Sequence, residues 1–235
     1  MKRTLIVNAD DANLTQGVTE AILACHDDGI VTSTSWLVNR MSCEKTVKAV
    51  QKRKRLGVGI HLNVTLGDPV SVPAKVRSLL QDNGQFKGYP RQLLKCPKAG
   101  ELDAEYQSQI KRFKQLFGRL PTHLDTHHQL HDHPLFFKVI AAIAKQYRLP
   151  VRRCRVSRMS GAGPGKISTT DFIFGNLSPA GYWRRETLEN ILMNLPEGTS
   201  EIVCHPGKVD RQLAAITSFT TGRAKEFELF RSGML

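Results

Sequence analysis

The sequence has few cysteines and no pattern that would pair them. The five are odd in number, lie far apart and form no C-x-x-C pair: Cys25, Cys43, Cys96, Cys154 and Cys204. This spacing argues against a disulfide framework and against a cysteine-based zinc site. A reducing cytoplasm is therefore the expected location of the protein.

Long apolar runs are also lacking, including at the N-terminus. Met1 to Arg3 is basic, but the apolar run behind it covers only residues 5–7 before the polar Asn8 and Asp10. Neither a signal peptide nor a membrane span fits this pattern, so no membrane partner is expected. No G-x-G-x-x-G or Walker loop follows the first predicted strand, which disfavours nucleotide binding by those routes.

Acidic residues are too few to balance the basic ones. The chain has 34 Lys and Arg against 21 Asp and Glu, and its formal net charge of +13 favours polyanions electrostatically. The basic residues gather at 52–55, at 111–114 and at Arg152, Arg153, Arg155 and Arg158. Among these clusters only 111–114 contains an aromatic residue, Phe113, and it belongs to the apolar spacing of the helix predicted at 102–117 rather than to a series of rings that could stack on bases. We therefore expect solvated faces, and nucleic acid is not an expected partner.

What remains is the composition of an ordinary globular protein. Of 235 residues, 40% are hydrophobic and 23% charged, so the chain can bury a core without disulfides or a structural metal. Residues 66–100 hold several prolines and glycines with little periodicity, and we interpret them as a long functional loop rather than a linker. A single domain over residues 1–235 is expected.

Short apolar runs alternate with segments of helical periodicity. The strand-like runs are residues 4–8, 30–39, 58–64, 123–125, 151–156 and 201–204. The helical segments are residues 18–25, 43–52, 102–117, 136–147, 186–195 and 223–230, and residues 157–181 have the character of a loop. This alternation predicts right-handed βαβ units and a parallel sheet, which both a (β/α) barrel and an open doubly wound sheet would satisfy.

Polar residues end several of the predicted strands. In a parallel α/β fold, functional side chains gather at the carboxyl ends of the strands. These ends read Asn-Ala-Asp-Asp at 8–11, Gly-Ile-His-Leu-Asn at 59–63, His-Leu-Asp-Thr-His-His at 123–128 and Cys-His-Pro-Gly at 204–207. Asp10 and Asp11 are either a base and a metal ligand, or a turn that caps the following helix.

Histidines are concentrated near the middle of the chain. Five of the eight fall between residues 123 and 133, a density that favours metal binding over a solvated loop. His61 is either a hydrogen-bonded core residue or a ligand. Asp11, His61 and one histidine of the cluster would supply one carboxylate and two imidazoles, a set typical of catalytic sites with open positions. His205 is a turn residue or a general acid.

At these residues the sequence resembles the YdjC-like family of carbohydrate deacetylases, which includes the chitooligosaccharide deacetylases. The resemblance runs from Leu5 to about Phe230, and its anchors are residues 6–11, 29–34, 57–62, 121–128 with His131, and 204–207. Two positions depart from the family pattern. Ala12 and Asn13 stand where Phe-Gly is usual, and Gln129 stands where many members have a third histidine.

The resemblance implies a TIM-barrel-like (β/α) fold and a site for one divalent metal ion, Mg or Zn. Its ligands would be Asp11, His61 and His127, with Asp10 as the general base and His205 as the general acid. Four further motif residues would support the ligands or contact the substrate: His123, Asp125, His128 and His131.

The implied reaction removes the N-acetyl group of a chitooligosaccharide and releases acetate. Asp10 would take a proton from water and His205 would protonate the departing amine, while the loop at 66–100 would cover the sugar. Two alternatives stay open. One is a metal-dependent hydrolase of a phosphoester or cyclic amide, and the other a non-catalytic protein that binds polyanions or metal. The expected partner is a small oligosaccharide, with a homodimer as a candidate assembly.

Overall fold

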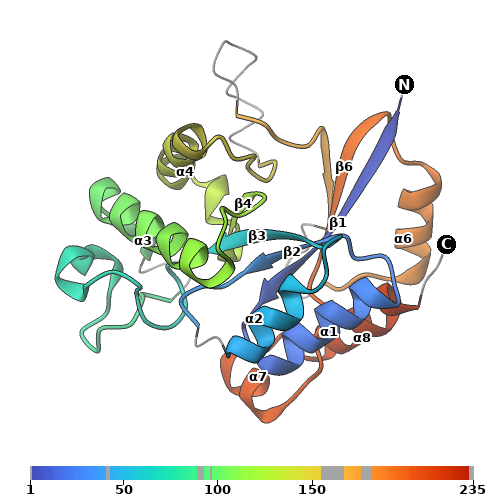
Figure 1. Cartoon of the computed structure of the whole chain (residues 1–235), viewed down its shortest axis with the longest axis horizontal. Coiled ribbons are helices and arrows are strands. Elements are labelled where there is room, and N and C mark those ends of the chain that lie inside the picture. Colours follow the sequence, from blue (N-terminus) through green and yellow to red (C-terminus); the bar gives the residue numbers. More distant parts are fainter. Residues whose placement is uncertain are drawn as a thin grey trace. The chain divides into compact units, whose positions relative to one another are not determined.

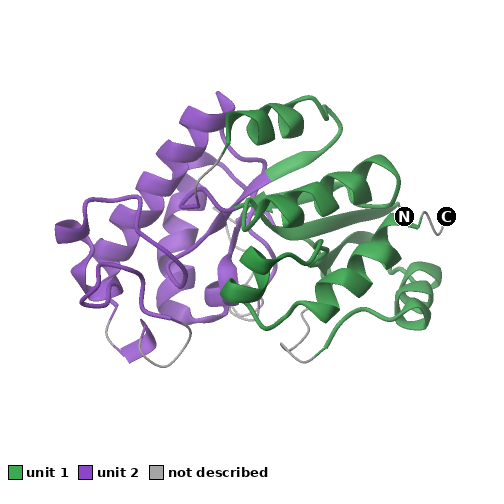
Figure 2. Cartoon of the chain, turned by 90° about the horizontal axis from the view of Figure 1, so that it is seen from below, with its two compact units in different colours: residues 1–36, 43–58, 170–235 green, residues 37–42, 59–169 purple. Residues whose placement is uncertain are grey.

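The computed structural model describes residues 2–40, 43–88, 93–95, 97–154, 167–175 and 181–232. By their internal contacts these residues form two compact units (Figure 2). Unit 1 comprises residues 1–36, 43–58 and 170–235, and unit 2 comprises residues 37–42 and 59–169. The strand that covers residues 57–62 begins in unit 1 and ends in unit 2, and a single domain over the whole chain stays a prediction.

The described strands form a six-stranded sheet in the order β4-β3-β2-β1-β6-β5 (Figure 1). The strands are β1 (Arg3–Ala12), β2 (Ser33–Trp36), β3 (Gly57–Leu62), β4 (Leu124–Thr126), β5 (Phe172–Phe174) and β6 (Gly198–Cys204). The β1–β2, β1–β6, β3–β4 and β5–β6 pairs are all parallel, as predicted. A TIM barrel closes with eight strands, so the described strands confirm a parallel α/β fold but not a closed barrel.

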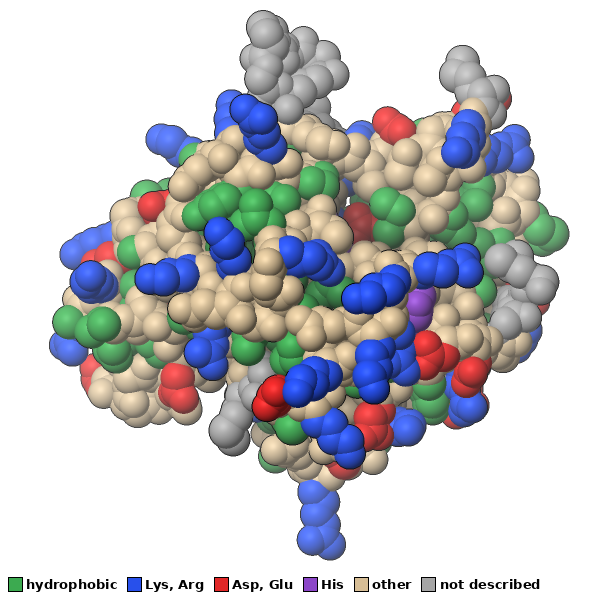
Figure 3. Space-filling view, viewed as in Figure 1, with side chains coloured by type: hydrophobic (Ala, Val, Ile, Leu, Met, Phe, Trp, Pro, Cys, Tyr) green, Lys and Arg blue, Asp and Glu red, His purple; other side chains and the backbone are tan. Residues whose placement is uncertain are grey.

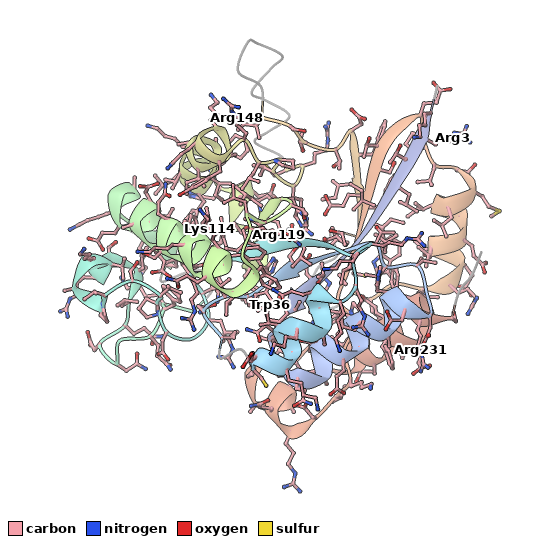
Figure 4. All side chains as sticks on the ribbon, viewed as in Figure 1. Arg3, Trp36, Lys114, Arg119, Arg148 and Arg231 are labelled. Atoms are coloured by element: carbon pink, nitrogen blue, oxygen red, sulfur yellow. The ribbon has the colours of Figure 1, made fainter. Side chains whose placement is uncertain are left out.

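Unit 1 is built around β1, which pairs with β2 on one side and with β6 on the other. Its helices are α1 (Gln16–Asp27), α2 (Glu44–Gln51), α6 (Arg185–Met193), α7 (Arg211–Ile216) and α8 (Thr221–Arg231). The first and last of these helices pack together, and the Ile30 N–H donates to the Phe230 carbonyl at 3.2 Å. Gly29 permits this approach, because a Cβ there would lie 2.1 Å from the same carbonyl oxygen. Trp36 is fully buried at the end of β2 (Figure 4).

Unit 2 consists of the end of β3, strand β4 and two packed helices, α3 (Ala99–Phe117) and α4 (Pro134–Tyr147). Helix α3 ends at Gly118, whose φ of 69° is the left-handed conformation that favours glycine. The predicted long loop contains three short 3₁₀ turns, η1 (Pro73–Lys75), η2 (Arg77–Leu79) and η3 (Leu93–Lys95). It buries its own apolar side chains, among them Leu79, Phe86 and Leu93, and therefore has a packed interior.

Three elements differ from the sequence-based expectation. Strand β5 lies inside the segment predicted to be a loop, and α7 was not predicted at all, because runs of three and six residues are too short for a periodicity to be read. The strand predicted at 151–156 is reduced to an isolated bridge between Val151 and Leu124 within residues 151–154, and residues 155–156 lie outside the described part.

Four of the five cysteines lie in the described part of the chain. Cys25, Cys43, Cys154 and Cys204 are free thiols, as the spacing predicted, and Cys96 lies outside the described part. Among the described helices, none combines the length and the apolar character that a membrane span needs.

The three basic clusters have different environments. Around 52–55 the side chains are mostly exposed, and Arg53 pairs with Asp27. Lys111, Arg112 and Lys114 are exposed on α3, as expected for a solvated face, and Figure 3 shows many such basic side chains with fewer acidic ones between them. Arg152 contradicts the solvated-face prediction, because its side chain is buried in unit 2. Arg155 and Arg158 lie outside the described residues.

Candidate active site

The carboxyl end of β1 carries the aspartate pair on an irregular piece of backbone. Ala9 pairs with Thr34 and Ala12 with Trp36, so β1 contains one residue more than β2 over this stretch, as in a β-bulge. Asp11 has a φ of 69°, the left-handed conformation that few non-glycine residues other than Asn, Asp and His adopt. Asp10 and Asp11 are both buried within the end of the strand, the Asp11 carbonyl accepts from the Leu14 N–H at 2.9 Å, and the side chain that caps α1 is that of Thr15.

Asp10 is oriented by a side chain of its own strand. The Asn8 Nδ2 donates to Asp10 Oδ1 at 2.8 Å and to the Ser35 hydroxyl at 2.9 Å. This amide therefore links the ends of β1 and β2 and fixes one carboxylate oxygen of Asp10. Asn8 was part of the predicted motif, but no role had been assigned to it.

Asp11 faces a basic residue from the far end of the chain. The Arg223 Nη2 of α8 lies 2.5 Å from Asp11 Oδ2, and both side chains are almost completely buried. A carboxylate has two oxygens and about four lone-pair positions, so this ion pair is compatible with a further contact to a cation. The sequence did not predict this role for Arg223. The pattern of α8 does not show which of its basic side chains points into the interior.

His205 lies beside Asp10 in unit 1. Its Nε2 is 3.8 Å from Asp10 Oδ2, and its side chain is 28% exposed. The backbone N–H of His205 donates to Glu226 Oε2 at 2.6 Å, so a buried carboxylate of α8 holds the turn that carries the ring. Burial raises the pKa of Glu226, against the opposing charge of His205 and the hydrogen bonds from the His205 and Trp183 backbones. The predicted base and the predicted acid are therefore neighbours.

His61 in unit 2 contacts Asp125 of β4, which also pairs with Arg152. Its Nδ1 lies 2.7 Å from Asp125 Oδ1, and Arg152 Nη2 lies 2.8 Å from Asp125 Oδ2. Burial opposes ionisation of Asp125, but the charges of Arg152 and His61 and the His61 hydrogen bond outweigh it and hold the pKa of that carboxyl well below its usual range. An ionised Asp125 accepts from Nδ1–H, which leaves Nε2 as the nitrogen of His61 that carries the lone pair.

His127 begins the 3₁₀ segment η4 (His127–Asp132), directly after β4. Its Nδ1 lies 2.7 Å from the Thr65 hydroxyl, and its ring centroid is 5.6 Å from that of His61. The next residue, His128, also contacts the Thr65 hydroxyl, at 3.0 Å through Nδ1. His128 and Gln129 both have positive φ, 55° and 53°, so the backbone is strained where the histidine cluster turns.

Two other histidines of the cluster have structural contacts. His131 is buried, and its Nδ1 lies 2.6 Å from the Thr126 hydroxyl. His123 packs against Gly59, where a Cβ would lie 2.3 Å from the ring, and its Nε2 is 3.9 Å from Asp125 Oδ2. The supporting roles that the resemblance implied for both residues stay a prediction.

Comparisons with known proteins find relatives over nearly the whole chain. The family model described as YdjC-like protein matches residues 4–235. The chain belongs to the YdjC-like family. It is 35% identical over 229 residues to a carbohydrate deacetylase of Geobacillus stearothermophilus, covering 96% of this chain and 88% of the relative. It is 31% identical over 242 residues to a chitooligosaccharide deacetylase of Proteus mirabilis (strain HI4320), covering 100% of this chain and 93% of the relative.

A solved structure resembles this YdjC-like chain over its whole length. A protein of Enterococcus faecalis V583, provisionally assigned to cellobiose-phosphate cleavage, superposes with a TM-score of 0.86 at 28% identity. The match covers 99% of this chain and 92% of that one. It supports the parallel α/β architecture.

Each unit of this YdjC-like chain holds a coherent part of the predicted site. Unit 1 brings together Asp10, Asp11 and His205, and unit 2 brings together His61, Asp125 and the histidine cluster. Four buried polar residues hold these groups without having been predicted to do so: Arg223 and Glu226 in unit 1, Asn63 and Thr65 in unit 2. Asn63 and Thr65 could have been suspected, because they follow His61 at a predicted strand end.

Proposed function

We propose that the protein hydrolyses the N-acetyl group of an N-acetylated oligosaccharide of the chitooligosaccharide type, releasing acetate and a free sugar amine. Membership of the YdjC-like family carries this proposal, together with relatives named carbohydrate and chitooligosaccharide deacetylases. The close approach of Asp10 and His205 supports it, because amide hydrolysis needs both a proton acceptor and a proton donor.

We propose that one divalent metal ion is held by Asp11, His61 and His127. The donor chemistry fits, since Asp125 and Thr65 contact the Nδ1 atoms of the two imidazoles, and metal-binding histidines commonly hydrogen-bond through the ring nitrogen that does not bind the metal. Two imidazoles and one carboxylate suit Zn and similar transition metals, whereas Mg prefers more oxygen ligands. When bound, the metal would supply Lewis-acid polarisation of the amide carbonyl and activation of water.

The chain's own residues would move the protons. Asp10 accepts a proton from the attacking water, the water oxygen bonds to the carbonyl carbon, and the C–N bond then breaks. His205 donates a proton to the departing nitrogen, because an unprotonated amine is a poor leaving group. One water is consumed, and the products are acetate and the sugar amine. Asn8 holds Asp10 in place, and Glu226 holds the backbone of His205.

A panel of substrates tests the proposal. We expect acetate release from N-acetylglucosamine oligomers and none from phosphodiesters or cyclic amides. Cleavage of the latter two without acetate release would favour the alternative hydrolase. Binding of nucleic acid with a steep salt dependence, unchanged in the variant Asp10→Asn, would favour the non-catalytic polyanion binder.

A cytoplasmic location and a homodimer stay predictions.

The variant His205→Ala tests the proposed acid. We expect the rate of acetate release at the optimum to fall on the order of 10²-fold, since a single general acid contributes about 10²–10⁴. In the parent protein the rate should rise as the base ionises and fall as the acid loses its proton, so the alkaline limb should flatten in the variant. The pH profile of acetate release, with metal content measured, checks this. An unchanged profile with a lower unfolding temperature would instead make His205 a turn residue.

A further inference from the structure

Thr65 stands between the two adjacent histidines of unit 2 and an amide whose orientation is fixed. Its hydroxyl lies 2.7 Å from His127 Nδ1, 3.0 Å from His128 Nδ1 and 3.1 Å from Asn63 Oδ1. A hydroxyl has one proton to donate and two lone pairs that accept. Which of these three partners receives the hydroxyl proton therefore depends on whether the facing atom of Asn63 is a donor or an acceptor.

Backbone groups fix the amide of Asn63. Its Oδ1 accepts from the N–H groups of Thr65 and Leu66 at 2.9 and 3.1 Å, and its Nδ2 donates to the Leu66 carbonyl at 2.8 Å. A backbone N–H can only donate and a carbonyl oxygen can only accept, so a flipped amide would lose all three bonds. The atom of Asn63 that faces the Thr65 hydroxyl is therefore an acceptor.

Residues of α3 hold Asn63 itself in position. The backbone N–H of Asn63 donates to Gln109 Oε1 at 3.0 Å, and its carbonyl accepts from Gln109 Nε2 at 2.6 Å. Glu105 Oε1 accepts from the same Nε2 at 2.8 Å, which fixes the orientation of the Gln109 amide. Glu105, Gln109 and Asn63 are fully buried, so the hydrogen bonds that join these three residues are made away from water and are costly to break.

We infer that Thr65 is a positioning residue that keeps the proton of His127 on Nδ1 and so presents Nε2 as its metal-binding nitrogen. Because the Thr65 hydroxyl gives its proton to Asn63, it can only accept from the two imidazoles. His127 and His128 therefore both carry a proton on Nδ1. The reverse arrangement would leave two acceptor oxygens, those of Asn63 and Thr65, facing each other at 3.1 Å without a proton between them.

This inference rests on the proposed function only in taking His127 as a metal ligand. The tautomer itself follows from the hydrogen bonds of unit 2 and exists without metal. Metal binding requires a lone pair on the coordinating nitrogen, and an imidazole whose proton moves to Nε2 must first exchange it before it can bind. Removing the hydroxyl should therefore weaken metal binding without removing any ligand.

Nitrogen NMR spectra of the metal-free protein at alkaline pH test the tautomer directly. We expect Nδ1–H forms for His127 and His128 in the parent protein and a shift of His127 toward the Nε2–H form in the variant Thr65→Val. The variant Thr65→Ser keeps a hydroxyl and should retain the parent tautomer. An Nε2–H form of His127 in the parent protein would overturn the inference, and this measurement needs no variant to fold.

Metal affinity, measured by competition with a chelator, gives the second readout. Thr65→Val should lower the affinity for Zn about 10- to 100-fold, the usual effect of losing a partner of a metal-binding histidine, and Thr65→Ser should restore most of it. Ser71→Ala is the matched control, because it removes a buried hydroxyl of the same unit that contacts Ala104 and Ser108 and no histidine.

The outcomes separate this inference from the proposed function. If the parent protein binds no metal, the proposed metal site fails, while the tautomer in the metal-free protein still decides the role of Thr65. If the parent protein binds metal and Thr65→Val matches it in tautomer and in affinity, the positioning role is wrong and the proposed function stands. Equal losses of unfolding temperature in both Thr65 variants, with neither readout changed, would show a purely structural role.

Discussion

Removal of divalent metal ions is expected to reduce acetate release to the uncatalysed rate while the chain stays folded. The proposed ligands lie at strand ends that are held independently of any ion. Asp11 is paired with Arg223, His61 with Asp125, and His127 with Thr65. Each unit also has its own buried apolar residues, so folding does not depend on metal as it does in small zinc domains.

The measurement combines activity with folding. Protein dialysed against a chelator is assayed for acetate release and for circular dichroism, and Zn, Co, Mn or Mg is then added back singly. We expect activity to return most fully with metals that accept imidazole ligands. Full activity in protein with no metal detected by mass spectrometry would contradict the proposed mechanism, and loss of the circular dichroism signal would show that the metal is structural.

The order of strands and helices could be predicted because each long element has a clear period and clear end signals. Helix α1 begins after Thr15, whose side chain accepts from the Val18 N–H, and α3 ends at Gly118. The aspartate pair and the histidine cluster were found for a related reason: polar residues that follow buried strands have few structural uses. The short elements β5 and α7 offer no such pattern, so tertiary contacts decide them.

The partners of the site residues were harder to predict, because they are set by packing between distant segments. Arg223 and Glu226 lie on α8, far along the chain from the Asp11 and His205 that they contact. Arg152 looked like part of a solvated basic cluster, yet it is buried against Asp125. A sequence shows which residues can carry charge, but only the folded chain shows which charges share a buried pocket of low polarity.

The variant Asp10→Asn is expected to lower the rate of acetate release about 10³-fold, within the range of about 10²–10⁴ that a general base contributes. The amide is nearly isosteric with the carboxylate, and its oxygen can keep the hydrogen bond from Asn8 Nδ2 that Asp10 Oδ1 now accepts. Its nitrogen then replaces Oδ2, the atom 3.8 Å from His205 Nε2. The shape of the site is therefore kept, while the ability to accept a proton from water is lost.

Metal content, measured beside the rate, decides how the activity of Asp10→Asn is lost. If Asp10 is the base, the variant should bind metal as the parent protein does and lose the acidic limb of its pH profile. If Asp10 is itself a ligand, metal content and activity should fall together. Asp82→Asn is the matched control, because it makes the same substitution at an exposed position in the loop of unit 2. If Asp10→Asn were as active as this control, Asp10 could not be the base, because an amide does not accept a proton from water.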